Sequence, residues 1–158
     1  MTDPLQLQWH CLPFTKLSSV QVHALLSLRQ QVFIIEQQCL YADADLLDLQ
    51  SYHLFALASD GDLVACARMI PPAILYPEVV IGRVVTRQYL RGQGIGRCLM
   101  EQALLHADRL FPEVTVRVSA QTRLQAFYLH LGFVAAGRPY DDEGIEHIDM
   151  FRAKQTGV

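Results

Sequence analysis

One stretch near the middle of the chain most limits what it can fold into. Residues 79–86, Val-Val-Ile-Gly-Arg-Val-Val-Thr, form an apolar, β-branched run of strand length. A glycine-rich turn follows at Arg91-Gly-Gln-Gly-Ile-Gly96, and residues 95–108 then repeat apolar side chains at helical spacing. The sequence therefore predicts a strand, a tight turn and a helix in direct succession.

The turn at residues 91–96 has the features of an anion-binding site. Glycines let a backbone approach a phosphate closely, and the first N–H groups of a helix are unpaired at the positive end of its dipole. Arg91 and Arg97 add positive charge beside the turn. A lone pair of glycines would indicate only a structural bend. Three glycines between arginines at a strand-to-helix junction favour a phosphate-bearing ligand.

Two common nucleotide motifs fit this turn poorly. The P-loop requires Lys-Ser or Lys-Thr after its last glycine, and no such pair follows here. The dinucleotide fingerprint needs a glycine where this chain has Arg97, and an acidic residue at the end of the next strand. That strand, predicted over residues 114–119, ends in apolar and hydroxyl residues. A nicotinamide-dependent oxidoreductase is therefore a weaker alternative.

Four motifs occur in the order of one known family. Arg91-x-x-Gly94-x-Gly96 resembles the pyrophosphate loop of the GNAT superfamily of acetyl-CoA-dependent N-acyltransferases. Leu28-Arg29-x-x-Val32-Phe33 resembles the first helix of that superfamily, and residues 61–68 resemble its hairpin. Its C-terminal helix motif is resembled by Gln121-x-x-x-Gln125-Ala-Phe-Tyr128-x-x-x-Gly132-Phe133. Residues 32–39 and 140–150 are similar to the ElaA branch of that superfamily. The resemblance covers nearly the whole chain.

The resemblance implies a fold and a domain organisation. It predicts one N-acetyltransferase domain over residues 1–158, with a core over about 8–153, and this length suits a single domain. The implied α/β (α+β) GNAT fold has a central mixed, mostly antiparallel, twisted sheet, splayed between two parallel central strands. About four helices flank such a sheet.

Local patterns add expectations for the individual elements. Ser18 and Gln21 have the spacing of a capping box at the start of a helix. Asp60-Gly61 predicts a type I′ turn between two strands. Helices are expected over about 94–110 and 121–131, and a final antiparallel pair over about 133–136 and 147–151.

The composition of the chain indicates which cellular compartment and which classes of binding partner to expect. No apolar run approaches the roughly 18 residues of a membrane span, and residues 1–5 lack a signal-peptide pattern. We therefore expect a cytoplasmic protein without membrane association. The net charge of −3, without a Lys/Arg run, argues against nucleic acid as a partner. Four scattered cysteines predict free thiols.

The resemblance also implies how acetyl-CoA, as co-substrate, would bind. Backbone groups at the end of the central strand would pair with its pantetheine arm, as an added strand does. The N–H groups of the turn would take the pyrophosphate. The residues of the strand end are Val84, Val85 and Thr86. Those of the turn are Arg91, Gly92, Gln93, Gly94, Ile95, Gly96 and Arg97. Gln121 matches a position where relatives often carry a cofactor-contacting Asn. No metal is expected, because the histidines lack ligand spacing.

Tyr128 is the expected general acid. It occupies the position where many GNAT enzymes carry a tyrosine that protonates the departing thiolate. A phenol pKa of about 10 is close enough to the thiol value of about 8.5 for that transfer. From the residues alone, packing beside Leu124, Phe127 and Leu131 is the commoner role of such a tyrosine. The motif favours the general acid.

The general base is left unassigned. Many relatives carry a Glu on the strand before the loop, but residues 79–86 hold no acid. Glu36, His53 and His147 are candidates, and a water chain to a distant carboxylate is equally open. Residues 36–52 also hold Asp43, Asp45 and Asp48 without any Lys or Arg. This segment is either a solvated loop or short helix, or a negative lip that attracts a cationic amine.

These observations predict direct acetyl transfer to a primary amine of a small-molecule or peptide acceptor. The sequence has no Gly-x-Ser-x-Gly nucleophile elbow and no recognisable Cys–His catalytic motif, so nothing supports a covalent acyl-enzyme intermediate. The alternative is a non-catalytic CoA-binding sensor or interaction module, which would keep the same loop. Members of the family are often dimers, so the resemblance leaves a homodimer open.

Overall fold

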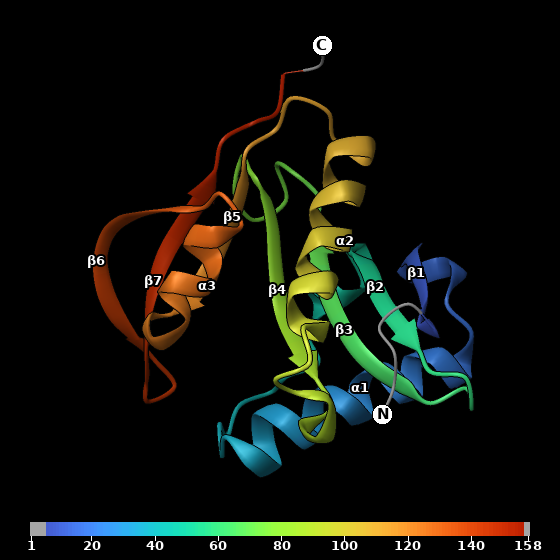
Figure 1. Cartoon of the computed structure of the whole chain (residues 1–158). Helices are drawn as coiled ribbons and strands as arrows, with labels where there is room; N and C mark the ends of the chain where they lie inside the picture. Colours follow the sequence, from blue (N-terminus) through green and yellow to red (C-terminus); the bar gives the residue numbers. More distant parts are fainter. Residues whose placement is uncertain (1–5, 157–158) are drawn as a thin grey trace.

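The computed structural model describes residues 6–156, which form one mixed seven-stranded sheet with three α-helices (Figure 1). The strands are β1 (Gln8–Pro13), β2 (Tyr52–Leu57), β3 (Leu63–Ile70), β4 (Val79–Thr86), β5 (Val116–Gln121), β6 (Val134–Asp142) and β7 (Ile145–Arg152). Their order across the sheet is β1-β2-β3-β4-β5-β7-β6. The expected fold is confirmed, with three α-helices in this part of the chain instead of about four.

The helices lie between the strands in sequence and are joined by short helical turns. The α-helices are α1 (Ser19–Gln30), α2 (Ile95–Leu110) and α3 (Gln125–His130). α1 continues into a π-helical turn, η3 (Gln31–Glu36). The 3-10 turns are η2 (Phe14–Lys16), η4 (Leu46–Gln50), η5 (Gln88–Leu90) and η6 (Thr122–Leu124). In residues 6–156, none of these helices is long and apolar enough to cross a membrane.

β4 and β5 are the parallel pair, and they separate along their length. Their pairing consists of Val79 opposite Val116 and Val80 opposite Arg117, while the other neighbouring strands are antiparallel. Beyond these two positions the strands diverge (Figure 1). The predicted parallel pair and the splay between its strands are confirmed.

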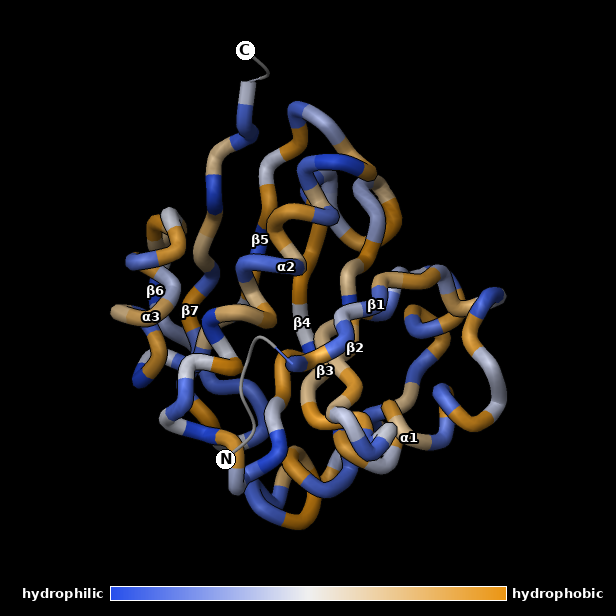
Figure 2. Tube along the Cα trace, turned by 45° about the vertical axis from the view of Figure 1, so that its right-hand side comes forward, coloured by the Kyte–Doolittle hydropathy of each residue, from blue (hydrophilic) through white to orange (hydrophobic). Residues whose placement is uncertain are grey.

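Helices cover both faces of the sheet around β3 and β4. On one face, α2 buries Ile95, Leu99, Ala103 and Ala107, the four residues whose spacing predicted an apolar stripe. On the other face, α1 belongs to a second buried cluster that includes β2, β3 and β4. The apolar colour in Figure 2 follows the central strands, as this two-sided packing requires.

Two local predictions have clear outcomes. The capping box is present: Ser18 Oγ accepts from the Gln21 N–H at 3.1 Å, and the Gln21 side chain accepts from the Ser18 N–H at 2.9 Å. The type I′ turn is wrong. Gly61 has a φ of +89° but Asp60 does not have a positive φ, and type I′ needs positive φ at both central residues. The Gly61 N–H instead bonds the Ala58 carbonyl, as in a type I turn closed by glycine.

The C-terminal elements differ in length from the expectation. The helix predicted over 121–131 is the 3-10 turn η6 followed by the six residues of α3. β6 and β7 are longer than predicted and form a hairpin that turns at Glu143-Gly144. The four cysteines are free thiols, as predicted, and two of them are buried.

Candidate active site

A cavity of about 450 Å³ lies where β4 and β5 diverge. Alternate residues of β5 line it, because alternate side chains of a strand share one face: Arg117, Ser119 and Gln121. On β4 all five residues 80–84 line it, and a positive φ of +51° at Arg83 interrupts the alternation there. The β6–β7 hairpin and residues of the segment 37–41 complete its walls. The splay of the sheet therefore creates the space for a ligand.

The glycine-rich turn lies directly between the end of β4 and the start of α2. Gly94 is the N-cap of α2 in a left-handed conformation, with φ of +82°, and no side chain of residues 6–156 caps the helix. A Cβ added at Gly92, Gly94 or Gly96 would meet nothing within 4 Å. The start of α2 thus lies beside a strand end with uncapped N–H groups and open space at its glycines, which suits an anion.

Polar side chains tie this turn to its surroundings. Arg91 Nη1 lies 2.8 Å from Glu36 Oε2 in η3, and Arg91 Nη2 donates to the Thr86 carbonyl at 3.1 Å. Gln93 donates to the Tyr89 carbonyl at 3.1 Å. Arg97 forms an exposed pair with Glu101. Glu36, a candidate base from the sequence, is therefore the ion-pair partner of Arg91, and it does not line the cavity.

Tyr128 lies on α3 with its side chain in the cavity wall. It is buried, and its ring packs edge-on against Phe127 and Phe133. Burial raises the pKa of Tyr128 to about 12, so the hydroxyl keeps its proton at physiological pH. The packing role and the position facing a ligand thus coexist in one residue.

The two candidate histidines occupy different environments. His53 is buried on β2, outside the cavity wall, and its Nε2 donates to the Asp48 carbonyl at 2.9 Å. Burial lowers the pKa of His53, which keeps the ring neutral. His147 lines the cavity, and its Nδ1 donates to the Ile145 carbonyl at 2.7 Å. Gln121 also lines the cavity, with its amide nitrogen 3.5 Å from Gln37 Oε1.

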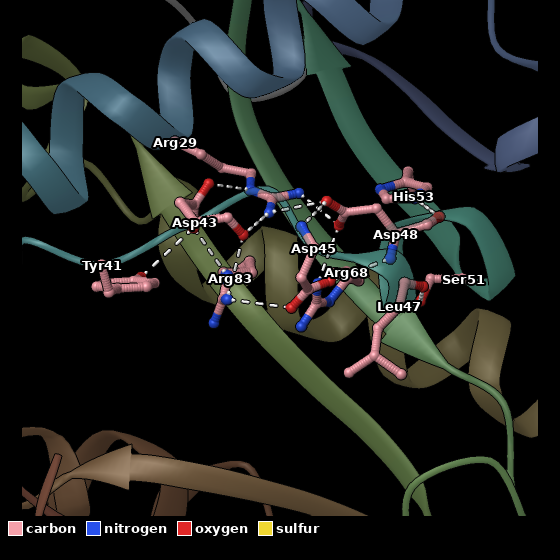
Figure 3. A network of polar contacts seen from close by, with 10 residues as sticks. All are labelled: Arg29, Tyr41, Asp43, Asp45, Leu47, Asp48, Ser51, His53, Arg68 and Arg83. Atoms are coloured by element: carbon pink, nitrogen blue, oxygen red, sulfur yellow. Dashed lines mark hydrogen bonds and ion pairs between the residues drawn. The ribbon is translucent and has the colours of Figure 1, made fainter. Parts of the chain in front are cut away.

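The acidic segment 36–52 contains a short helix, the 3-10 turn η4, but its aspartates are neither left to solvent nor arranged as an open negative lip. Its aspartates bind three arginines from α1, β3 and β4 (Figure 3). Arg29 lies between Asp43 and Asp48, with nitrogen–oxygen distances of 2.8 Å to each. The other contacts are Arg68 to Asp45 and Asp48 at 2.6 and 2.9 Å, and Arg83 to Asp43 and Asp45 at 2.8 and 3.5 Å.

Sequence reasoning missed a second polar group on the cavity floor. Tyr140 Oη donates to Asp149 Oδ1 at 2.7 Å and is hydrogen-bonded to Ser119 Oγ. Arg117 Nη2 donates to Asp149 Oδ2 at 2.7 Å, and its guanidinium lies 3.6 Å from the centre of the Tyr76 ring. The signal that could have found it is the alternation of polar residues along β5, at positions 117, 119 and 121.

Comparison with known proteins places this geometry in a family. A family model described as the acetyltransferase (GNAT) domain matches residues 17–153. Protein ElaA of Escherichia coli K12 is 38% identical over 148 residues, which span 92% of this chain and 96% of that protein. The crystal structure of ElaA from E. coli has a TM-score of 0.87, covering 92% of this chain and 99% of its own. That of an acyl-CoA N-acyltransferase from Pseudomonas aeruginosa has a TM-score of 0.90 at 45% identity, covering 93% and 99%.

Proposed function

This chain belongs to the GNAT acetyltransferase family, and we propose that it transfers the acetyl group of acetyl-CoA directly to a primary amine. The family supports an acyl-CoA co-substrate and an amine acceptor. The acetyl group and the direct attack are the parts that we add. The thioester supplies an activated acyl carbon and a thiolate leaving group. The residues of the cavity must bind and orient the two substrates and transfer the protons.

The observation that carries the proposal is the free edge of β4 next to the uncapped start of α2. From residue 81 onward, β4 has no β5 partner in residues 6–156; it pairs with β3 at residues 81–82 and 85–86, on either side of an irregularity at residues 83–84. The backbone N–H and C=O groups of Val84, Val85 and Thr86 can therefore form hydrogen bonds with the amide groups of a pantetheine arm, which would lie beside β4 like an added strand. The strand then leads to the turn at residues 91–97, whose N–H groups suit the pyrophosphate.

Gly96 supports the phosphate role of this turn independently of the backbone bend. Unlike Gly92 and Gly94, it does not have a positive φ, and an added Cβ would meet no atom within 4 Å. The fold itself therefore gives no reason for a glycine there, although glycine is a poor residue within a helix. The close approach of a phosphate to the backbone does give a reason.

We assign the protonation of the departing thiolate to Tyr128. Tyr128 lines the cavity and carries its proton throughout the physiological range. Burial raises its pKa to about 12, which is farther above the thiol value of about 8.5 than the ordinary phenol value of about 10, so the phenol must regain a proton as it gives one up. The C–N bond forms as the C–S bond breaks, and the phenol gives its proton to the sulfur. His147 lies in the same cavity and is the substrate-side candidate among the predicted bases. Glu36 pairs with Arg91 and His53 bonds the Asp48 carbonyl, both outside the cavity wall, so we assign neither a role in the reaction.

A Tyr128→Phe variant separates an enzyme from a CoA-binding sensor. For an enzyme, we expect unchanged acetyl-CoA affinity and a loss of about 100-fold in the rate of thiol release with an amine acceptor. Tyr52→Phe is the control, because Tyr52 lies on β2 outside the cavity. Thiol release that is equal in both variants would contradict the assignment of Tyr128. A wild type that binds acetyl-CoA without releasing thiol to any primary amine would favour the sensor.

A further inference from the structure

Three side chains on neighbouring strands form a hydrogen-bonded chain on the floor of the cavity. They are Ser119 on β5, Asp149 on β7 and Tyr140 on β6, and all three line the cavity. Ser119 is paired in register with Asp149, and Tyr140 with His147 two residues earlier on β7. The three side chains therefore lie on one face of the sheet.

The chemistry of the three groups fixes the direction of their hydrogen bonds. The Asp149 carboxylate can only accept, so Tyr140 gives its single hydroxyl hydrogen to Oδ1 at 2.7 Å. Tyr140 then has only lone pairs to offer Ser119, and the Ser119 hydroxyl must donate to it. The lone pairs of the Ser119 hydroxyl oxygen remain available to accept a hydrogen bond from a donor group in the cavity. The chain thus ends in a hydrogen-bond acceptor.

Two further features hold this direction in place. Arg117 donates to the second carboxylate oxygen of Asp149 at 2.7 Å, so both carboxylate oxygens accept a hydrogen bond. Burial, together with the hydrogen bond and charge of Asp149, raises the pKa of Tyr140, so its hydroxyl keeps its hydrogen. The other titratable groups facing the chain are His147, which stacks on the Tyr140 ring, and Asp142 at the end of β6.

The position of Ser119 suits contact with the acceptor. Continuing the parallel register from Val80 and Arg117 by two residues places Ser119 across the cavity from Gly82. Val84, where the proposed pantetheine contact begins, is two residues farther along β4. Ser119 therefore lies level with the part of β4 that precedes the cofactor arm, where the reacting carbon and the incoming nitrogen must meet.

The charges around the cavity favour a cation. Each arginine in its wall has a carboxylate partner: Arg68 and Arg83 bind aspartates of the segment 43–48, and Arg117 binds Asp149. Asp142 and Glu143 also line the cavity and have no ion-pair partner in the described residues 6–156. The surplus negative charge suits an ammonium group and opposes an anionic acceptor.

We propose that Ser119, Tyr140 and Asp149 receive the amino group of the acceptor and take the proton that its ammonium form must lose. This inference rests on the proposed function, in which the amine arrives protonated because its pKa is near 10. The N–H bond breaks and the proton moves to Ser119. The proton of Ser119 passes to Tyr140, and that of Tyr140 passes to Asp149. Asp149 is partly exposed and returns the proton to solvent.

The remaining steps balance the protons of the reaction. The neutral nitrogen uses its lone pair to form the C–N bond, and the C–S bond breaks. The nitrogen then loses a second proton, which replaces the one that Tyr128 gives to the thiolate. Over one turnover, one proton ends on the thiol and one is released to solvent. In this account Ser119 touches the acceptor, whereas Tyr140 and Asp149 act through it.

Two amines with the same carbon skeleton but different basicity test the proton transfer. At pH 7 ethylamine is an ammonium ion, whereas 2,2,2-trifluoroethylamine is neutral and has no such proton to lose. We expect Tyr140→Phe and Ser119→Ala to lower kcat/KM for ethylamine by about 100-fold. Both should lower kcat/KM for the fluorinated amine by much less, because that amine has no ammonium proton to lose and only the contact with its nitrogen is weakened. Tyr52→Phe, the matched loss of a hydroxyl outside the cavity, should change neither.

The contradicting results are distinct. An equal loss with both amines would assign the chain a structural role, and an absence of loss with both would remove it from the reaction. Ser119→Ala keeps the test decisive if Tyr140→Phe does not fold. Calorimetric titration with acetyl-CoA separates the two levels of the account. A wild type that binds no acetyl-CoA overturns the proposed function, whereas intact binding with equal losses overturns only the proton transfer.

Discussion

Gly96 is the residue at which folding and cofactor binding make opposite demands. It lies in the first turn of α2 without a positive φ, where alanine is the better residue for folding. The space around it is open in the structure. If that space receives a pyrophosphate, the missing side chain is a functional requirement that lowers stability.

For Gly96→Ala we therefore expect a gain in the free energy of unfolding of up to about 1 kcal/mol. We also expect a loss in acetyl-CoA affinity of at least about tenfold, or about 1.4 kcal/mol, because the methyl group keeps phosphate away from the N–H groups. Urea unfolding and calorimetry measure the two effects. Unchanged affinity in a more stable variant would indicate that phosphate does not approach this position.

At the scale of elements, the ion-pair network of the segment 43–48 joins α1, β3 and β4 beside the cavity. Burial alone would raise the pKa of Asp48, but hydrogen bonds and charges from Arg29 and Arg68 hold it below its usual value. The position of the segment thus depends on buried charges that are paired. Removing one partner leaves an uncompensated charge in the interior.

Asp48→Asn should lower the free energy of unfolding by about 3–5 kcal/mol at pH 7. The depressed pKa means that this stabilisation is complete above the unfolded-state pKa of about 3.9 and is lost as the pH falls through the folded-state value. The difference between wild type and variant should therefore shrink in urea unfolding below about pH 4. Asp62→Asn, in the more exposed pair with Arg87, should cost less than about 1 kcal/mol. Equal losses in the two variants would contradict a buried network.

The sequence predicted those elements whose signals are local. The Ser18 capping box, the apolar stripe of α2 and the β-branched run of β4 each depend on neighbouring residues, and the structure has all three. The contacts that it did not predict join distant positions. Asp43 and Asp48 follow Arg29 by 14 and 19 residues, and Ser119 and Tyr140 are 21 residues apart. Such pairs become visible only when the strand order is known.

For the whole molecule, the splayed sheet combines the two halves of the proposed site. In the proposed function the β4 edge and the start of α2 would form a path for acetyl-CoA, and the β5–β7–β6 part of the sheet would form the floor on which the amine lies. Both halves depend on the limited pairing of β4 with β5. Binding of acetyl-CoA along the first half is the central claim, because every chemical step requires it.

Calorimetric titration of acetyl-CoA into the wild type, Gly94→Glu and Gly137→Glu tests this claim most directly, with NADH as the control ligand. Gly94 and Gly137 have nearly equal φ, +82° and +81°, so the two variants carry the same backbone strain and the same added charge. Only the first places a carboxylate in the proposed phosphate turn. We predict binding of acetyl-CoA but not NADH by the wild type, its loss in Gly94→Glu and its retention in Gly137→Glu. A wild type that does not bind acetyl-CoA would contradict the acyltransferase account and leave the glycine turn a purely structural bend.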